Sequence, residues 1–235
     1  IEVNPRSSRT VPFISKATGI PMIDLAVGCM KGEKLIDSKF GTGVFKERNI
    51  TAVKAPVFSM SKLTDVDTFL GPEMKSTGEV MGISDNYEEA LSKAFISSGL
   101  HIPRKGSVLL SIADKDKKVS EGLIKLINER GYKMVATPGT AKLINSLGFE
   151  AEVIEKRLDK NPNVLDMIKA AKVIAVVNTV TGDRKTLQDG FRIRRAATER
   201  KLPCFTSLDT AKAVFGDKVL EENLSVKSLN EYLSL

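Results

Sequence analysis

The chain has 235 residues with a formal net charge of +7, and 42% of them are hydrophobic, enough for the cores of one large or two small globular domains. No stretch approaches the ~20 apolar residues that cross a bilayer, nothing at the N-terminus resembles a signal peptide, and two cysteines are too few for a disulfide framework. So few cysteines fit a reducing cytoplasm, and without an apolar span we expect no membrane partner. Because basic and acidic residues are interspersed, we expect no nucleic-acid partner, and the net positive charge suits small phosphorylated ligands equally well.

The first six residues read as an extended segment, which turns Glu2, Asn4 and Arg6 to one face. A carboxylate and an amide oxygen two residues apart can share a hard cation such as Mg²⁺, and an arginine beside them suits the phosphate oxygens that accompany the cation. Arg9 adds a second phosphate partner. The alternative is a solvated edge strand, which the spacing alone favours.

Apolar periodicity predicts three further elements before residue 100. They are a helix over residues 22–30, a strand over residues 50–58 and a helix over residues 87–98. We expect Asp85 to cap the last helix, because Glu88 and Glu89 then fall in its first turn, where the helix dipole favours negative charge.

A polar stretch over residues 101–106, containing a proline and a glycine, marks the expected domain boundary. It divides the chain into residues 1–100 and residues 101–235. His101, the only histidine, lies in this stretch with no serine or cysteine partner at motif spacing, and we interpret it as a surface or hinge residue.

After the boundary, short apolar strands alternate with helices, which predicts an α/β domain with a doubly wound parallel sheet. The expected strands cover residues 108–113, 132–136, 149–154, 173–177 and 203–206. The helices between them end near Gly131, Gly148, Ala171 and Lys201, and a last helix begins at Asp209. Ligands of such sheets bind beyond the carboxyl ends of the strands, so the loops there are the candidate sites.

One of these loops, residues 136–140, combines features of a phosphate site. Thr137 can cap the next helix, Pro138 suits its first position, and Gly139 lets a ligand approach the backbone. The hydroxyls of Thr137 and Thr140 would complete the cradle. The alternative is plain N-capping by Thr137.

A second loop, residues 178–182, ends an apolar strand in Asn178 and two threonine hydroxyls, which could read a base or a ribose. An Asx turn is the alternative. Lys117 and Lys156 could add charge to the same pocket, or be solvated lysines. The arginines at positions 192, 194 and 195 are expected to be structural, on a helix where most arginines face solvent.

Four segments together resemble one family: residues 1–6 (IEVNPR), 9–13 (RTVPF), 15–19 (SKATG) and 70–82 (LGPEMKSTGEVMG). They are similar to the C-terminal portion of the large subunit of carbamoyl-phosphate synthase. The resemblance implies that residues 1–100 are the C-terminal part of the second ATP-grasp module, an α+β domain that phosphorylates carbamate. It implies that residues 101–235 are the allosteric domain, which has the methylglyoxal-synthase-like fold.

The family makes carbamoyl phosphate from bicarbonate, glutamine-derived ammonia and two ATP, for pyrimidine and arginine synthesis. The resemblance implies that Glu2 and Asn4 bind Mg²⁺ or Mn²⁺ at the second ATP site, with Arg6 and Arg9 near the phosphates. Its expected partners are the remainder of the large subunit and the glutaminase small subunit. This portion alone is expected to be regulatory and inactive as a ligase.

The resemblance also implies that the C-terminal domain binds a nucleotide effector, UMP or IMP. The matching positions are Lys117, Thr137, Thr140, Lys156 and Asn178, with Thr181 substituting for a hydroxyl that Val180 replaces. Thr206 matches a contact of the activator ornithine, but Ala55 stands where bacterial enzymes carry an ornithine-binding glutamate, which argues against ornithine.

Two functions from other classes compete with this one. A methylglyoxal synthase-like lyase would use an aspartate and a histidine near the phosphate of dihydroxyacetone phosphate. It is disfavoured because no histidine follows Gly106. A nucleic-acid binder predicts association that weakens strongly with salt.

Overall fold

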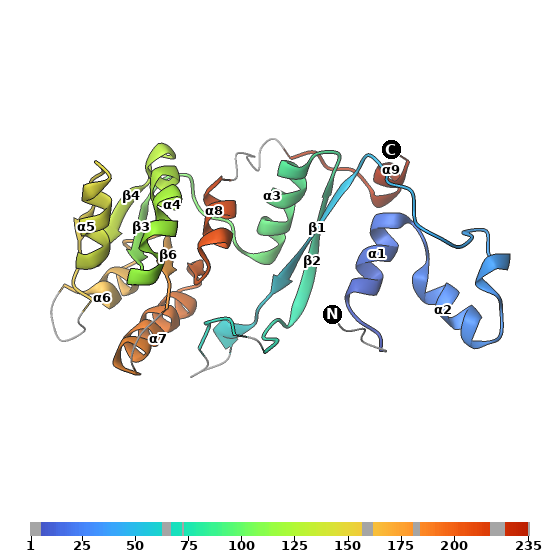
Figure 1. Cartoon of the computed structure of the whole chain (residues 1–235), viewed down its shortest axis with the longest axis horizontal. Coiled ribbons are helices and arrows are strands. Elements are labelled where there is room, and N and C mark those ends of the chain that lie inside the picture. Colours follow the sequence, from blue (N-terminus) through green and yellow to red (C-terminus); the bar gives the residue numbers. More distant parts are fainter. Residues whose placement is uncertain are drawn as a thin grey trace. The chain divides into compact units, whose positions relative to one another are not determined.

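The computed structural model describes residues 6–62, 67–71, 73–156, 162–180, 184–216 and 224–234. The chain divides into two compact units, each assembled from separate segments (Figure 1). The first unit comprises Ile1–Pro56, Glu79–Ser98 and Lys218–Leu235, and the second comprises Val57–Gly78 and Gly99–Asp217. The chain therefore passes between the units more than once, and the domain boundary expected near residue 101 stays a prediction.

In the first unit, the described residues form a two-stranded sheet and four helices. Its strands are β1 (Thr51–Val57) and β2 (Gly78–Ser84), and its helices are α1 (Thr10–Thr18), α2 (Met22–Met30), α3 (Tyr87–Ser98) and α9 (Leu229–Leu233), with a 3₁₀ turn, η1 (Leu35–Asp37). In the described part of the chain no single helix is long and apolar enough to cross a membrane. Only α1 and α2 taken together, with a 113° bend between them, have the length and composition for it.

The helices predicted over residues 22–30 and 87–98 are confirmed, but the predicted cap of α3 is wrong. Asn86, and not Asp85, accepts a hydrogen bond from the Glu89 N–H, at 2.8 Å. Asp85 precedes the N-cap position by one residue, and its carboxylate instead accepts hydrogen bonds from the side chains on either side of it. Asn and Asp are comparable N-caps, so composition alone does not choose between adjacent positions.

A buried carboxylate ties the C-terminal residues to α3. Glu89 is 7% exposed and accepts hydrogen bonds from Ser84 Oγ at 2.6 Å and from the backbone and hydroxyl of Ser225 at 2.5 and 2.7 Å. Lys93 lies 3.1 Å from the same carboxylate and donates to the Tyr232 hydroxyl at 2.7 Å. Burial raises the pKa of Glu89, but these hydrogen bonds outweigh it and bring the pKa down to about 2.

The second unit contains a five-stranded parallel sheet in the order β5-β4-β3-β6-β7. Its strands are β3 (Ser107–Ser111), β4 (Lys133–Ala136), β5 (Glu152–Val153), β6 (Ala175–Asn178) and β7 (Cys204–Phe205). Its helices are α4 (Lys117–Glu129), α5 (Pro138–Ser146), α6 (Val164–Lys169), α7 (Arg184–Glu199) and α8 (Leu208–Gly216), with 3₁₀ turns η2 (Met60–Lys62) and η3 (Asp114–Asp116). The predicted α/β class and all five predicted strands are confirmed.

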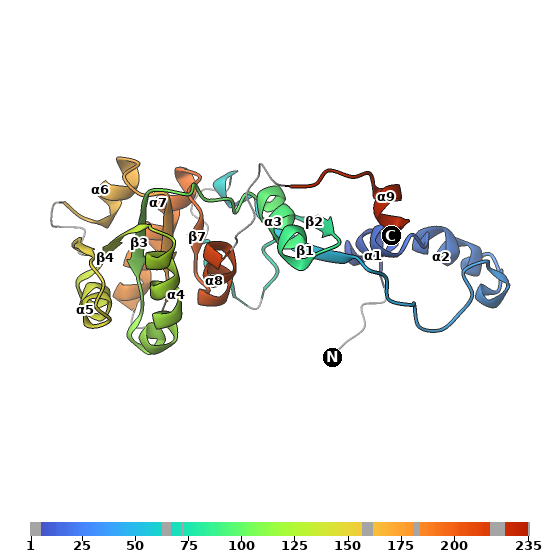
Figure 2. The same ribbon diagram turned by 90° about the horizontal axis from the view of Figure 1, so that it is seen from above.

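Helices cover both faces of this sheet, with α4, α5 and α8 on one side and α6 and α7 on the other (Figure 2). Successive strand residues point to opposite faces. Leu109, Val135 and Val176 therefore share the face that packs against Ile168 and Ile193. Their neighbours, such as Leu110, are equally buried on the other face. The strands are short apolar runs because both of their faces are covered.

Candidate anion-binding site

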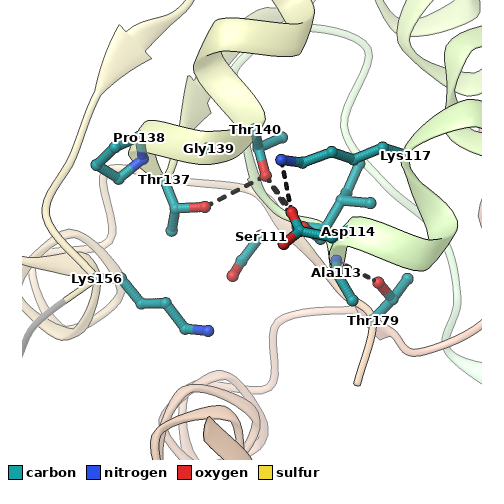
Figure 3. Close-up of a pocket in the computed structure, with 11 residues that line it drawn as sticks. Ser111, Ala113, Asp114, Lys117, Thr137, Pro138, Gly139, Thr140, Lys156 and Thr179 are labelled. Carbon is teal, nitrogen blue, oxygen red and sulfur yellow. Dashed lines mark hydrogen bonds and ion pairs between the residues drawn. The ribbon is translucent and has the colours of Figure 1, made fainter. Parts of the chain in front are cut away.

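A cavity of about 370 Å³ opens at the carboxyl ends of β3, β4 and β6. The strand order reverses between β3 and β6, since the chain runs outward from β3 to β5 and then returns to β6. Such a reversal leaves a crevice at the strand ends, where ligands of open α/β sheets bind. The lining residues are Ser111, Ile112, Ala113, Asp114, Lys117, Thr137, Pro138, Gly139, Thr140, Lys156 and Thr179 (Figure 3).

The N-terminus of α5 forms one wall of the cavity. Thr137 is the N-cap residue, with extended backbone angles, but its side chain makes no capping hydrogen bond. Pro138 has no N–H, and Thr140 N–H already bonds to the Thr137 carbonyl at 2.9 Å. At the second position of the helix, the Gly139 N–H has no intrahelical acceptor. It is the backbone donor that α5 offers to an anion.

Threonine hydroxyls hold the loops around the cavity in place. Thr140 Oγ1 accepts from the Ile112 N–H at 3.0 Å and from the Thr137 hydroxyl at 3.3 Å. Thr179 Oγ1 accepts from the Ala113 N–H at 2.8 Å. The loop that follows β3 is thereby fastened to α5 on one side and to the end of β6 on the other. The Thr137 hydroxyl donates to another side chain and not to the backbone, so it can turn to a ligand.

Two lysines reach the cavity from different elements, Lys117 from the start of α4 and Lys156 from the loop after β5 (Figure 3). Lys117 Nζ lies 2.7 Å from Asp114 Oδ1 and would lie 3.3 Å from a Cβ atom at Gly139. The hydrogen bond and charge of Lys117, and then the charge of Lys156, lower the pKa of Asp114. The cavity lining therefore holds two ammonium groups and one carboxylate.

Residues 121–206 match the family model of the MGS-like domain. The match covers α5, the loop with Lys156, and the ends of β4 and β6, and it begins four residues after Lys117. It agrees with the methylglyoxal-synthase-like fold expected for this part of the chain. The MGS-like domain thus contributes the α5 wall of the cavity and one of its two lysines.

Of the residues predicted to bind a nucleotide, Lys117, Thr137, Thr140 and Lys156 lie together in the cavity lining. Asn178 does not line it: the side chain is 2% exposed and accepts a hydrogen bond from Arg194 Nη1 at 2.9 Å. This arrangement is not the Asx turn considered as the alternative.

Four lining residues were not predicted, and they lie at the end of β3 or directly after it: Ser111, Ile112, Ala113 and Asp114. Ser111 is a polar residue at the end of a buried strand, which was the available signal. Thr179, one of the two threonine hydroxyls predicted in the loop after β6, does line the cavity. The predicted Thr181 lies outside the described residues.

Arg194 has a structural role, as expected, but it does not face solvent as most arginines on such a helix do. It is 1% exposed and binds Asp67 through two hydrogen bonds, Nε to Oδ1 at 2.8 Å and Nη2 to Oδ2 at 2.5 Å. The signal was present in the pattern of α7. Gly190, Ile193, Arg194 and Ala197 follow the i, i+3, i+4, i+7 spacing of a buried helical stripe, and Arg194 falls inside it.

The residues predicted for the metal and ATP-phosphate site belong to the first unit. Glu2 and Asn4 lie outside the described residues. Arg6 is exposed and donates to the Ser7 carbonyl at 3.3 Å. Arg9 lines a separate cavity of about 480 Å³ with Lys16 and Lys54. Among the described residues, no three His, Cys, Asp or Glu side chains gather where they could hold a metal ion.

Two predictions outside the cavity have a simple structural outcome. His101 is exposed, as expected for a surface residue. Thr206 follows β7 and does not line the cavity at the N-terminus of α5, while Ala55 is buried in β1. The ornithine assignment of Thr206 stays a prediction.

Proposed function

We propose that the second unit binds a phosphomonoester, with its phosphate held at the N-terminus of α5. The observation that carries this proposal is the convergence of Lys117, Lys156 and the Gly139 N–H on one cavity. A helix N-terminus favours an anion through its dipole and its unpaired N–H groups. The positively charged ammonium groups of Lys117 and Lys156 complement the dianionic phosphate group of a monoester.

Lys117 would bind the phosphate by exchange, because it already holds a carboxylate. Asp114 is its partner, and the Asp114 side chain is 93% exposed, so it can withdraw into water without losing a buried contact. A phosphate brings more negative charge and three acceptor oxygens to the same ammonium group. Lys156 makes no ion pair among the described residues and would add to the attraction.

The volume of the cavity suits more than a phosphate. At about 370 Å³ it falls in the range of small-ligand pockets, and it has room for a sugar beside the phosphate. The hydroxyls of Ser111 and Thr179 border that space. We propose UMP or IMP as the ligand, on the family resemblance of Lys117 and of the residues around Thr137.

We further propose that the chain is the regulatory C-terminal portion of a carbamoyl-phosphate synthase large subunit. In that enzyme Glu2 and Asn4 would hold Mg²⁺ or Mn²⁺ with ATP, with Arg6 and Arg9 near the phosphates. Its partners would be the remainder of the large subunit and the glutaminase subunit, in the cytoplasm, in pyrimidine and arginine synthesis. The support is the set of four sequence segments together with the match of residues 121–206 to the MGS-like domain.

A methylglyoxal synthase-like lyase is the second candidate, since the family match fits it equally. It needs a base and an acid beside the phosphate of dihydroxyacetone phosphate. The only carboxylate in the described lining is Asp114, paired with Lys117, and the sequence after Gly106 contains no histidine. Release of methylglyoxal from dihydroxyacetone phosphate by the purified chain would replace our proposal with this one.

The proposed function is tested by calorimetric titration of the chain with UMP, IMP and ornithine. We expect a nucleotide to bind, and Lys117→Met and Lys156→Met each to weaken it about tenfold through loss of a charge-assisted hydrogen bond. Lys118→Met is the matched control, since Lys118 is exposed and does not line the cavity. No heat with either nucleotide, or equal weakening in the control, would overturn the proposal.

A further inference from the structure

A buried arginine, Arg194, is hydrogen-bonded to the end of a strand that borders the cavity, and the residues around it leave space for its guanidinium. Arg194 on α7 is 1% exposed, and a Cβ atom at Gly190 would come within 2.7 Å of Arg194 Nη1. Only the absence of a side chain at Gly190 therefore leaves room for the guanidinium. The Phe69 ring lies 5.9 Å from its central carbon.

The guanidinium divides its donors between two partners. Nε and Nη2 bind both carboxylate oxygens of Asp67, and Nη1 binds Asn178 Oδ1 at 2.9 Å. Because the guanidinium is rigid and planar, the two hydrogen bonds to Asp67 also fix the direction in which Nη1 points toward Asn178. Asp67 also accepts from the Phe69 N–H at 2.9 Å, so its own carboxylate is held in place.

From Asn178 the hydrogen bonds continue into the cavity wall. Asn178 Nδ2 donates to the Ser111 carbonyl at 3.4 Å, and the Thr179 N–H donates to the same carbonyl at 3.2 Å. Thr179 in turn accepts from the Ala113 N–H. Ser111, Ala113 and Thr179 all line the cavity.

We propose that Asp67 is a positioning residue for the phosphate cavity and acts through Arg194 and Asn178 on the ends of β3 and β6. The identity of the ligand in this inference rests on the proposed function, whereas the contacts between Asp67, Arg194 and Asn178 do not depend on it. Docking of Asp67 and Phe69 onto Arg194 then favours a formed cavity, and by thermodynamic reciprocity a bound ligand favours that docking.

Electrostatic attraction alone predicts that removing the Asp67 carboxylate strengthens anion binding, whereas a positioning role predicts that it weakens binding. Asp67 and Arg194 together are neutral, so removing the Asp67 carboxylate leaves a buried positive charge near the cavity and should attract an anion. Positioning predicts weaker binding, because Arg194 loses the partner that aims it at Asn178. The two explanations are therefore separable by the direction of one mutational effect.

The experiment compares Asp67→Asn with Glu73→Gln, which removes the same charge from the same segment at an exposed side chain that does not touch Arg194. In the ligand-free protein we expect hydrogen exchange at the Ala113 and Thr179 amides to be at least about fivefold faster in Asp67→Asn, and unchanged in the control. UMP affinity should fall about three- to tenfold in Asp67→Asn alone. Asp67→Glu, which restores the carboxylate, should recover part of the loss.

Unchanged exchange at Ala113 and Thr179, or tighter nucleotide binding by Asp67→Asn, would overturn the inference. If the wild-type chain binds neither nucleotide nor inorganic phosphate, the proposed function fails. The exchange rates of the ligand-free protein decide the role of Asp67 even then.

Discussion

Gly139→Ala should make the second unit more stable and its ligand bind more weakly. Gly139 is the second residue of α5 and does not have a positive φ, so alanine fits its backbone and should add about 0.5 to 1 kcal/mol of stability. The new methyl group would lie 3.3 Å from Lys117 Nζ, a contact that this flexible side chain can relieve by a small shift. The methyl group would then fill the space between the ammonium and the Gly139 N–H, where the phosphate is proposed to lie.

The expected loss of affinity follows from the hydrogen bond that is blocked. A bond from a backbone N–H to a charged oxygen contributes about 1.5 to 3 kcal/mol, which corresponds to about a 10- to 100-fold weaker complex. Calorimetry with UMP measures the affinity, and urea unfolding measures the stability. Gly122→Ala in α4 is the control, because its Cβ atom would meet nothing closer than 3.8 Å and should add stability without changing affinity. Equal affinities in the wild type and Gly139→Ala would refute the placement of the phosphate.

Three further predictions concern stability and reactivity. Glu89→Gln should lower the stability of the first unit by about 2 to 3 kcal/mol at neutral pH, since its pKa is lowered from 4.5 to about 2. A carboxyl group whose pKa is lowered on folding stabilises the protein above its unfolded pKa. The difference in urea midpoint between the wild type and Glu89→Gln should therefore persist above pH 5 and vanish as the pH falls towards 2. A difference that grows in acid would contradict this. Arg194→Met should lower the free energy of unfolding, measured with urea, by about 3 kcal/mol, because it leaves Asp67 without its partner. An unchanged urea midpoint would show that the ion pair does not contribute to stability. Burial raises the pKa of the Cys204 thiol to about 12, so a thiol reagent at pH 8 should label the exposed Cys29 first, and equal rates would count against that burial.

The fold of the second unit follows from patterns that are local in the sequence. Short apolar strands and amphipathic helices alternate there, and Gly131 and Gly148 end α4 and α5 with positive φ, as C-terminal glycines do. The C-terminal α9 was not predicted. Its contact with the rest of the first unit depends on Tyr232 and on the buried carboxylate of Glu89, which join segments more than a hundred residues apart.

The candidate site was predictable where a residue's role depends on its own loop. Thr137 and Gly139 belong to a strand-to-helix turn whose chemistry the sequence displays, and the structure brings both to one cavity with Lys117. Asn178 shows the limit of such reasoning. Its polar side chain at a strand end resembles a ligand contact, but Arg194 occupies it, and that arginine is held by a carboxylate over a hundred residues earlier in the chain. No local pattern contains that partner.

The central claim is that a phosphate binds at the N-terminus of α5, and amide chemical shifts test it most directly. In a ¹⁵N-resolved titration of the whole chain with UMP, and separately with inorganic phosphate, the Gly139 amide should shift most, with smaller shifts at Thr140 and Ala113. Both titrations should move the same peaks, because the phosphate group is common to the two ligands. Shifts that spare Gly139, or that appear elsewhere in the chain, would contradict the account.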